Sequence, residues 1–315
     1  MTGNAATPLL IVTGPTGTGK TETAIRVAER IGGEIVGCDA LQVYLGFDAA
    51  TAKPSAAEQA RVRHHLVDVA DPRTDFSLAD YVRLAEQAVA DIAGRGLVPL
   101  VVGGTGMYLR GLLRGIVPAP ARDEALRARL KAMVERYGSA RLHRVLARLD
   151  PVSAARVMPA DTQRIIRALE IGFAGDGTWS EVIARQGTWS HDEDRFPSLK
   201  VGLDGEREGM NRRLDRRVEG FYAAGLVEEV RGLLDSGVPA SANAFKAIGY
   251  REVLRALGRG EDPAGMIEEI QRNTRRFAKR QRTWFRKEPG LRWLDADAGA
   301  DVLAERIVTL WNDCF

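Results

Sequence analysis

Short apolar runs alternate with amphipathic stretches over the first hundred residues of the chain. The apolar runs end near Gly, Asp or Pro and predict strands at residues 9–13, 34–38, 65–69 and 98–102. The amphipathic stretches predict helices at residues 21–30 and 78–93. Strands that alternate with helices are typical of βαβ units in a parallel sheet. We therefore expect functional groups at the carboxyl ends of these strands.

The pattern changes near residue 116, where Pro118 and Pro120 interrupt it. Residues 122–170 are helical in pattern and contain eleven Lys or Arg against six Asp or Glu. Residues 172–197 predict a mobile return connection. Strands are then predicted at residues 199–203 and 291–294, and helices at 210–224, 227–236, 250–257 and 264–286. We expect a core of residues 1–115 and 198–315, interrupted by a mostly helical insert of residues 116–197.

The composition restricts the class of protein without naming its partner. The 315 residues are 45% hydrophobic and 28% charged, which suits a folded chain with a sizeable core. The net charge of +3 leaves any nucleic-acid signal to local clusters. Cys38 and Cys314 are the only cysteines, which excludes a disulfide framework and a four-thiolate metal site. Without a basic leader or an apolar stretch of about 18 residues, we expect a soluble, cytoplasmic monomer with no membrane partner.

A glycine-rich segment lies between the first predicted strand and the first predicted helix. Its residues, which match the pattern G-x-x-x-x-G-K-[ST], are Gly14, Pro15, Thr16, Gly17, Thr18, Gly19, Lys20 and Thr21. The glycines let backbone N–H groups face a polyphosphate at the positive end of a helix dipole. Lys20 supplies a point charge, and the Thr21 hydroxyl can bind Mg²⁺. The segment predicts a P-loop NTPase-like α/β fold and a di- or triphosphate ligand, without deciding whether that ligand is ATP.

Polar residues follow two further predicted strands. Asp39 closes the strand at residues 34–38, and three roles fit its position: a Mg²⁺ ligand, a general base acting on the acceptor, or a helix N-cap. Lys53, in the loop that follows, is either a second phosphate contact or a solvated loop lysine. Residues 103–106 form a second glycine turn that would let the backbone approach a ligand closely. Within it, Thr105 can donate a hydrogen bond to a leaving oxygen.

The adjacent residues His64 and His65 raise the possibility of a metal site. Neighbouring side chains on an extended segment point to opposite faces. The sequence also shows no nearby third ligand at the spacing of a metal site. We therefore favour a structural or hydrogen-bonding role for both histidines.

Basic residues gather in one long segment, residues 272–287, which carries eight positive charges and no acid. In a helix, one side would pack on the core through Ile267, Ile270, Phe277 and Trp284. A wetter side would carry Arg272, Arg276, Lys279, Arg282 and Arg286. A solvated basic face is the plain alternative, but repulsion among like charges favours a polyanion partner.

Two shorter clusters add to this basic character. Gln163, Arg164 and Arg167 fall within one helical turn and suit splayed bases and phosphates. The second cluster consists of Arg212, Arg213, Arg216 and Arg217. It contains an i, i+4 pair that can reach back to a diphosphate.

These motifs, in this order, closely resemble the bacterial tRNA dimethylallyltransferases, also called tRNA isopentenyltransferases. The matching stretches are residues 14–21, 39–44, 51–54, 64–68, 76–81, 99–108, 161–170, 249–252 and 273–286, nearly the whole chain. The resemblance implies that the phosphate loop holds dimethylallyl diphosphate, with Mg²⁺. It also implies transfer of the five-carbon group to N6 of the adenosine 3′ of the anticodon, position 37, in tRNAs that read codons beginning with U.

The same resemblance implies roles for individual residues. Asp39 would be the general base or the orienter of the attacking amine, and Thr105 would contact the oxygen that bridges prenyl carbon and diphosphate. Arg217 would join Lys20 on the phosphates. The residues expected to contact the tRNA anticodon stem-loop are Asp39, Ala40, Leu41, Gln42, Thr105, Arg127, Gln163, Arg164, Ile165, Ile166, Arg167, Phe245, Lys246, Gly249, Tyr250, Arg276, Arg280 and Arg282. Many relatives have Ser and Met in place of Ala40 and Leu41, so a base contact through a serine hydroxyl is not expected here.

Three other functions share some of these features. A P-loop kinase of small molecules or nucleotides would use residues 9–110 with ATP, but it gives no purpose to the basic insert or to residues 272–287. An enzyme that prenylates free adenine nucleotides would have no use for an RNA-binding insert. An RNA-binding regulatory ATPase would leave Asp39 and Thr105 without an acceptor.

Overall fold

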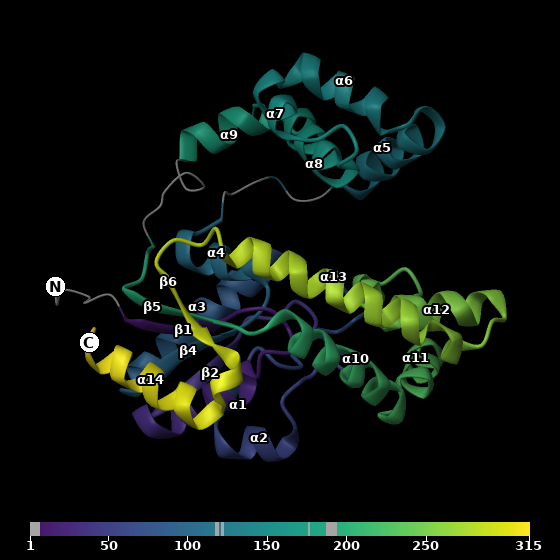
Figure 1. Cartoon of the computed structure of the whole chain (residues 1–315). Helices are drawn as coiled ribbons and strands as arrows, with labels where there is room; N and C mark the ends of the chain where they lie inside the picture. The colour runs from purple at the N-terminus through teal and green to yellow at the C-terminus, as the bar shows by residue number, and fades with distance from the viewer. Residues whose placement is uncertain (1–6, 117–119, 121–122, 176, 187–193) are drawn as a thin grey trace. The chain divides into compact units, whose positions relative to one another are not determined.

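The chain forms two compact units. The computed structural model describes residues 7–116, 120, 123–175, 177–186 and 194–315 (Figure 1). The first unit, here called the core unit, consists of Met1–Leu113 and Asp194–Phe315, and the insert unit consists of Arg114–Glu193. The sequence analysis places the two boundaries a few residues further on, after residues 115 and 197.

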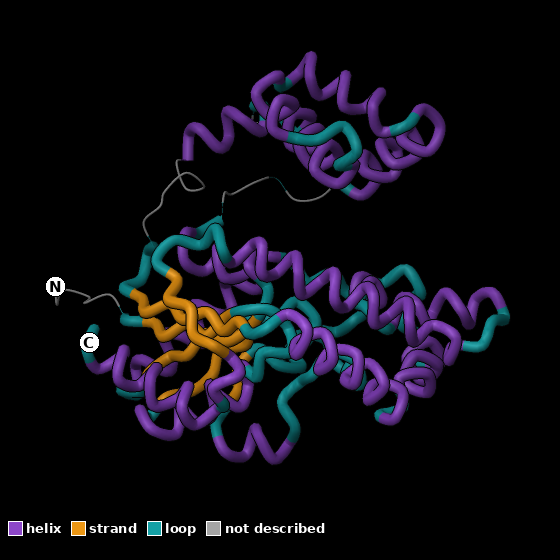
Figure 2. The backbone as a smooth tube through the Cα atoms, viewed as in Figure 1, coloured by secondary structure: helices purple, strands orange, loops and turns teal. Residues whose placement is uncertain are grey.

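The core unit is built around a six-stranded sheet with the order β3-β2-β4-β1-β5-β6 (Figure 2). The strands are β1 (Leu9–Thr13), β2 (Gly33–Gly37), β3 (His64–His65), β4 (Val98–Gly103), β5 (Ser198–Asp204) and β6 (Leu291–Asp295). All pairings are parallel, so the expected parallel sheet is confirmed. The strand predicted at residues 65–69 is wrong in extent, because positive φ angles of 63° at Leu66 and 54° at Asp68 end the extended backbone.

Helices cover both faces of this sheet. The helices α1 (Lys20–Ile31) and α14 (Ala300–Asn312) share a hydrophobic cluster with Leu10 and Val12 of β1. The helix α3 (Leu78–Gly94) contacts β2 and β4 outside that cluster, and therefore on the other face. Every residue of β1 is buried, as expected for a parallel strand covered on both sides. The sequence analysis did not predict α2 (Ala56–Arg61), α4 (Gly106–Arg114) or α14.

A second group of helices lies beyond the carboxyl end of the sheet (Figure 1). It consists of α10 (Arg207–Ala223), α11 (Leu226–Asp235), α12 (Tyr250–Arg259) and α13 (Ile267–Phe285), with the short 3₁₀ helices η1 (Asn243–Lys246) and η2 (Pro263–Met266). Its hydrophobic core is aromatic: the Phe47 ring centroid lies 5.2 Å from Phe245 and 4.8 Å from Tyr250. This packing fixes the loop after β2 against α12.

The insert unit is a helical bundle with its own hydrophobic core. Its helices are α5 (Glu124–Tyr137), α6 (Ser139–Leu149), α7 (Pro151–Arg156), α8 (Thr162–Phe173) and α9 (Trp179–Gln186). The prediction of a mobile connection at residues 172–197 is wrong for the last residues of α8 and for the residues of α9, which are helical. Residues 187–193 lie outside the described residues. In the described part of the chain, no helix is both long enough and apolar enough to span a membrane.

Candidate active site at the carboxyl end of the sheet

The phosphate loop connects β1 to α1, as its sequence predicts. Gly14 has a φ of +135°, and a Cβ there would lie 2.2 Å from the Leu203 carbonyl oxygen of β5. Glycine is therefore required for the loop to pass the neighbouring strand. Helix α1 begins at Lys20, so the amino end of the helix, which is the positive end of its dipole, faces the loop. The geometry suits an anion at this end of β1.

Lys20 folds back onto the phosphate loop. Its Nζ donates hydrogen bonds to the carbonyl oxygens of Gly14 at 3.0 Å and Pro15 at 2.7 Å. The pKa of Lys20 is lowered to about 8, mainly by burial; the Asp39 carboxylate opposes this shift and the nearby Arg217 adds to it. An anionic ligand in the loop would stabilise the ammonium and raise this pKa.

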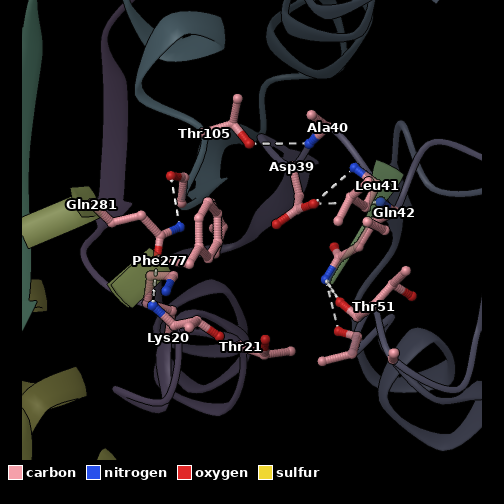
Figure 3. Close-up of a pocket in the computed structure, with 18 of the residues that line it drawn as sticks. Lys20, Thr21, Asp39, Ala40, Leu41, Gln42, Thr51, Thr105, Phe277 and Gln281 are labelled. Carbon is pink, nitrogen blue, oxygen red and sulfur yellow. Dashed lines mark hydrogen bonds between the residues drawn. The ribbon is translucent and has the colours of Figure 1, made fainter. Parts of the chain in front are cut away.

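Asp39 follows β2, and its two carboxylate oxygens have different surroundings. One oxygen, Oδ1, accepts hydrogen bonds from the backbone N–H groups of Leu41 at 2.9 Å and Gln42 at 3.4 Å. The other oxygen points away from these amides into the cavity (Figure 3). Oδ1 therefore closes a turn and does not cap a helix, because the next helix begins only at Ala56. The second oxygen stays oriented toward the ligand space. Gln42 anchors the same turn by donating from Nε2 to the Ala52 carbonyl at 2.7 Å.

Thr105 lies beside this turn and is held in a defined orientation. Its Oγ1 accepts a hydrogen bond from the Ala40 N–H at 3.0 Å, and its own N–H donates to the Cys38 carbonyl at 3.1 Å (Figure 3). Because Oγ1 serves as acceptor for Ala40, its hydroxyl proton is directed elsewhere. Thr105 lines the cavity, so this proton can be donated to an oxygen of a ligand.

The glycines of the second turn line the cavity, and they also approach other parts of the protein closely. A Cβ on Gly103 would lie 2.0 Å from the Cys38 carbonyl oxygen. On Gly104 it would lie 2.3 Å from Nε2 of Gln281, and on Gly106 it would lie 2.0 Å from the indole nitrogen of Trp284. These glycines therefore let β2 and α13 close around Thr105.

One cavity of about 750 Å³ in the core unit unites these elements. Its polar wall is formed by Lys20, Thr21, Asp39, Thr105 and Arg217. Its apolar wall includes Phe221, Phe277, Trp284 and Met107. Burial lowers the pKa of Arg217, while the Asp39 carboxylate raises it. The cavity thus offers cations for a diphosphate next to an apolar surface.

The sequence matches the family described as IPP transferase over residues 42–288, and the family described as isopentenyl transferase over residues 7–73. A tRNA dimethylallyltransferase of Desulforudis audaxviator is 46% identical over 303 residues, covering 95% of this chain and 96% of that protein. One from Geobacter sulfurreducens is 43% identical over 298 residues, covering 95% of each. The chain belongs to the IPP transferase family.

Solved structures of IPP transferases share the fold. The tRNA isopentenylpyrophosphate transferase of Bacillus halodurans superposes with a TM-score of 0.71 at 35% identity, covering 97% of this chain and 96% of that one. A eukaryotic dimethylallyltransferase, described as acting on tRNA, has a TM-score of 0.81 at 25% identity, covering 98% of this chain and 79% of that one. The P-loop NTPase-like fold and the resemblance to tRNA dimethylallyltransferases are confirmed.

The oxygen atoms expected to bind Mg²⁺ lie in the same cavity as the phosphate loop. Thr21 follows Lys20 in the first turn of α1, and the second carboxylate oxygen of Asp39 points into the cavity (Figure 3). Hydroxyl and carboxylate oxygens are hard donors of the kind that Mg²⁺ prefers, usually together with phosphate oxygens and water. These side chains fit a diphosphate-bound Mg²⁺.

His65 has the hydrogen-bonding role that the sequence analysis favours, whereas His64 has its Nδ1 at 2.8 Å from the Val62 carbonyl oxygen and also lines the cavity. His65 lies 2.7 Å from a Glu34 oxygen, and Asp91 completes a group of three possible metal ligands. The Arg95 guanidinium bonds both Glu34, at 2.5 Å and 2.6 Å, and Asp91, at 2.9 Å. Its hydrogen bonds, more than its charge, lower the pKa of Glu34 to about 2. The cluster is therefore an ion-pair network that already contains its cation.

Lys53 is neither a second phosphate contact nor a solvated loop lysine. Its Nζ donates to the Tyr44 carbonyl at 2.6 Å and to carboxylate oxygens of Asp48 at 2.6 Å and Asp68 at 2.5 Å. The side chain is only 7% exposed. Lys53 therefore neutralises two carboxylates and holds the loop after β2, and it is absent from the residues that line the cavity.

Two residues expected to contact RNA near α12 are core residues instead. Phe245 is 2% exposed and Tyr250 is 0% exposed, because both pack in the aromatic cluster around Phe47. The Tyr250 hydroxyl donates to Glu229 at 2.5 Å. Their side chains are therefore not RNA contacts, whereas exposed Lys246 lines the cavity.

Helix α13 packs on the core through Ile267 and Ile270 as predicted, but the rest of its buried stripe differs from the prediction. The buried residues are Ile270, Thr274, Ala278, Gln281 and Phe285. Phe277 and Trp284, expected in the core, line the cavity, and Trp284 is 38% exposed. Arg282, expected on the wetter side, bonds Asp204 at 2.6 Å. Arg276 and Arg280 are exposed. Sequence analysis missed Gln281, because a polar residue among arginines gives no sign that it is buried.

The arginines of α10 also separate into different environments. Arg217 lines the cavity. Arg213 bonds Asp297 at 2.8 Å and donates to the Gly17 carbonyl of the phosphate loop at 3.3 Å. Arg212 and Arg216 are exposed. Of the predicted i, i+4 pair, one member therefore faces the cavity and the other supports the loop.

The residues predicted for RNA contact in the insert unit also differ in exposure: some are buried and some are exposed. Ile165 and Ile166 are 0% and 1% exposed within the hydrophobic core of this unit, so their side chains are not RNA contacts. Arg127 is ion-paired with the buried Glu170 at 3.0 Å. Gln163 and Arg164 are exposed, and Arg167 is partly exposed. The surface of α8 therefore offers three polar side chains for a partner.

Proposed function

We propose that the protein transfers the dimethylallyl group of dimethylallyl diphosphate to N6 of the adenosine immediately 3′ of the anticodon, at tRNA position 37. Diphosphate is the leaving group, and the substrates are tRNAs that read codons beginning with U. The observation that carries the proposal is the single cavity in which the phosphate loop, Asp39, Thr105 and Arg217 meet an apolar wall. Membership of the IPP transferase family supports it.

The chemistry explains why such a cavity is needed. An aromatic exocyclic amine is a poor nucleophile, so the rate depends on aligning it with the prenyl carbon and on stabilising the departing diphosphate. Lys20 and Arg217 place two cations at the phosphate end. The Thr105 hydroxyl, oriented by Ala40, would donate to the oxygen that leaves the prenyl carbon. The free oxygen of Asp39 would accept from the attacking amine and receive its proton.

The proposal includes Mg²⁺ bound through Thr21, with Asp39, which lines the same cavity, as a further oxygen ligand. When bound, Mg²⁺ would neutralise charge on the diphosphate oxygens. The half-buried Lys20 and Arg217 would hold the remaining negative charge. Asp39 keeps its turn through Leu41 and Gln42, so its second oxygen is available for the amine or the metal.

The tRNA anticodon stem-loop is the proposed acceptor. An adenine can reach a buried acceptor site only after leaving its stack, and aromatic side chains such as Phe277 and Trp284 favour the extruded base. Exposed Arg276 and Arg280 on α13, and Gln163 and Arg164 on α8, supply contacts for the surrounding RNA. A small-molecule kinase has no use for these residues.

The decisive experiment incubates the purified protein with Mg²⁺, dimethylallyl diphosphate and an anticodon stem-loop carrying consecutive adenosines. Digestion and mass measurement of the nucleosides should reveal one adenosine heavier by an isopentenyl unit, without added ATP. A matched stem-loop with guanosine at position 37 should remain unmodified. ATP turnover on a small acceptor, with no modified adenosine, would support the kinase instead.

A further inference from the structure

Gln281 of α13 connects two loops of the active site. Its Oε1 accepts a hydrogen bond from the Thr16 N–H at 2.9 Å, and its Nε2 donates to the Gly104 carbonyl at 2.9 Å (Figure 3). The side chain is 6% exposed. Both polar ends of one buried amide are thus satisfied by backbone groups far apart in the sequence.

The two loops that Gln281 joins have different tasks in the proposed reaction. Thr16 belongs to the phosphate loop, and Gly104 directly precedes Thr105. One loop would hold the diphosphate, and the other would contact the oxygen at which the carbon–oxygen bond breaks. The amide therefore sets the spacing between the groups that bind the two ends of the leaving group.

The glycine at position 104 matches this amide. The φ angle of Gly104 lies outside the left-handed region, so its backbone conformation permits a side chain. A Cβ would nevertheless lie 2.3 Å from Nε2 of Gln281, while its other neighbours are at 3.4 Å. The close approach of Gln281 is thus the main obstacle to a side chain at this position.

The amide of Gln281 meets requirements that a carboxylate or an ammonium group would not meet. A carboxylate would accept from Thr16, but it would not donate to Gly104 and would add negative charge beside the diphosphate. A lysine would donate but not accept. Glutamine does both while remaining neutral.

We propose that Gln281 is a positioning residue for prenyl transfer, acting through Thr16 and Gly104 to fix the phosphate loop against Thr105. The inference rests on the proposed function. It predicts an effect on turnover that exceeds the effect on diphosphate binding, because the spacing matters most as the leaving oxygen separates from carbon.

The test replaces Gln281→Met, which keeps the length of the side chain and removes both hydrogen bonds. The matched control is Gln271→Met on the same helix, where Nε2 donates to the Asp215 carbonyl at 3.3 Å away from the cavity. Rates are divided by the number of sites that bind inorganic diphosphate, so that unfolded protein does not contribute. We expect Gln281→Met to lower kcat at least tenfold with KM for RNA unchanged, and Gln271→Met to stay within twofold.

A second variant tests the same bridge from its other side. Gly104→Ala should displace the Gln281 amide and lower kcat to a similar extent. In the double variant Gly104→Ala/Gln281→Met, the loss should match the larger single loss, because both changes break one bridge. Additive losses, or a kcat of Gln281→Met within twofold of wild type, would overturn the role of Gln281. A wild-type enzyme that prenylates no RNA would contradict the proposed function and the role that rests on it.

Discussion

At the scale of single residues, the cavity depends on side chains that each serve the fold and the ligand at once. Asp39 caps its own turn with one oxygen and offers the other to the cavity. Thr105 accepts from Ala40 and so directs its proton away. Lys20 is held beside the phosphate loop by hydrogen bonds to the Gly14 and Pro15 carbonyl oxygens. Preorganisation of this kind keeps reorganisation during the reaction small.

The division of labour at Asp39 leads to a prediction for Asp39→Asn. The amide oxygen can still accept from Leu41 and Gln42, so the turn should be kept while the negative charge is removed. We expect kcat for prenyl transfer to fall roughly 100-fold, at the lower end of general-base effects. Affinity for the RNA stem-loop, measured by fluorescence anisotropy, should change little. Unchanged turnover would rule out a catalytic role for this carboxylate.

The lowered pKa of Lys20 predicts a pH dependence of diphosphate binding. The free protein loses the Lys20 proton near pH 8, whereas a bound diphosphate raises this pKa, so binding takes up a proton above pH 8. Affinity for inorganic diphosphate should therefore be constant just below pH 8 and weaken by up to about tenfold per pH unit above it. Isothermal titration calorimetry in buffers of different ionisation enthalpy measures this uptake. Lys20→Met should bind more weakly and lack the dependence.

At the scale of elements, α13 presents three different surfaces. One packs on the core through Ile270, Ala278 and Phe285. One lines the cavity through Phe277 and Trp284, with Gln281 reaching the phosphate loop beside them. The third is exposed and basic. Sequence periodicity alone assigned the aromatic residues to the core, because large apolar side chains in a helix usually are buried there. In the structure, Phe277 and Trp284 line the cavity beside the helix, so that assignment is wrong.

The exposed arginines of α13 lead to a prediction for how RNA affinity depends on salt concentration. Arg276 and Arg280 are exposed, whereas Arg275 on the same helix is ion-paired with Asp215. Replacing the two exposed arginines by Gln should weaken RNA binding and reduce the slope of log affinity against log salt by about 0.7 for each phosphate that is no longer neutralised. Arg275→Gln is the matched control and should leave the slope unchanged. An unaltered slope in the double variant would mean that this face is only solvated.

At the scale of the whole molecule, the chain forms two compact units, and we propose that the diphosphate site belongs to one of them alone. The core unit contains the sheet, the cavity and the proposed diphosphate ligands, and the insert unit has a separate hydrophobic core. Each unit can therefore be perturbed through its own buried residues. Substitutions in the insert unit should act on RNA use without altering the phosphate loop.

This separation predicts different outcomes for two neighbouring residues of α8. Ile166 is 1% exposed, so Ile166→Ala should destabilise the insert unit by about 2–5 kcal/mol. Gln163→Ala changes an exposed side chain and should alter stability by less than about 0.5 kcal/mol while weakening RNA binding. Thermal unfolding followed by circular dichroism measures stability. Calorimetry with inorganic diphosphate should give wild-type affinity for both variants, and a weakened affinity would contradict the separation.

The sequence by itself determined the parallel α/β core, the position of the phosphate loop and the family, because these depend on local periodicity and on short motifs. The phosphate loop needs only glycines between a strand and a helix, and its residues are contiguous. Asp39, Thr105 and Arg217 were candidates from their positions, the resemblance selected their roles, and their meeting in one cavity required the fold.

Only the tertiary structure decided which polar and aromatic residues face inward. Lys53 forms ion pairs with two carboxylates. Phe245 and Tyr250 pack in an aromatic core, and Ile165 and Ile166 pack in the hydrophobic core of the insert unit. Gln281 became a buried bridge between loops 265 and 177 residues away. Such outcomes depend on which distant backbone groups a side chain meets. Residue type and local spacing carry no information about those partners, and only packing brings them together.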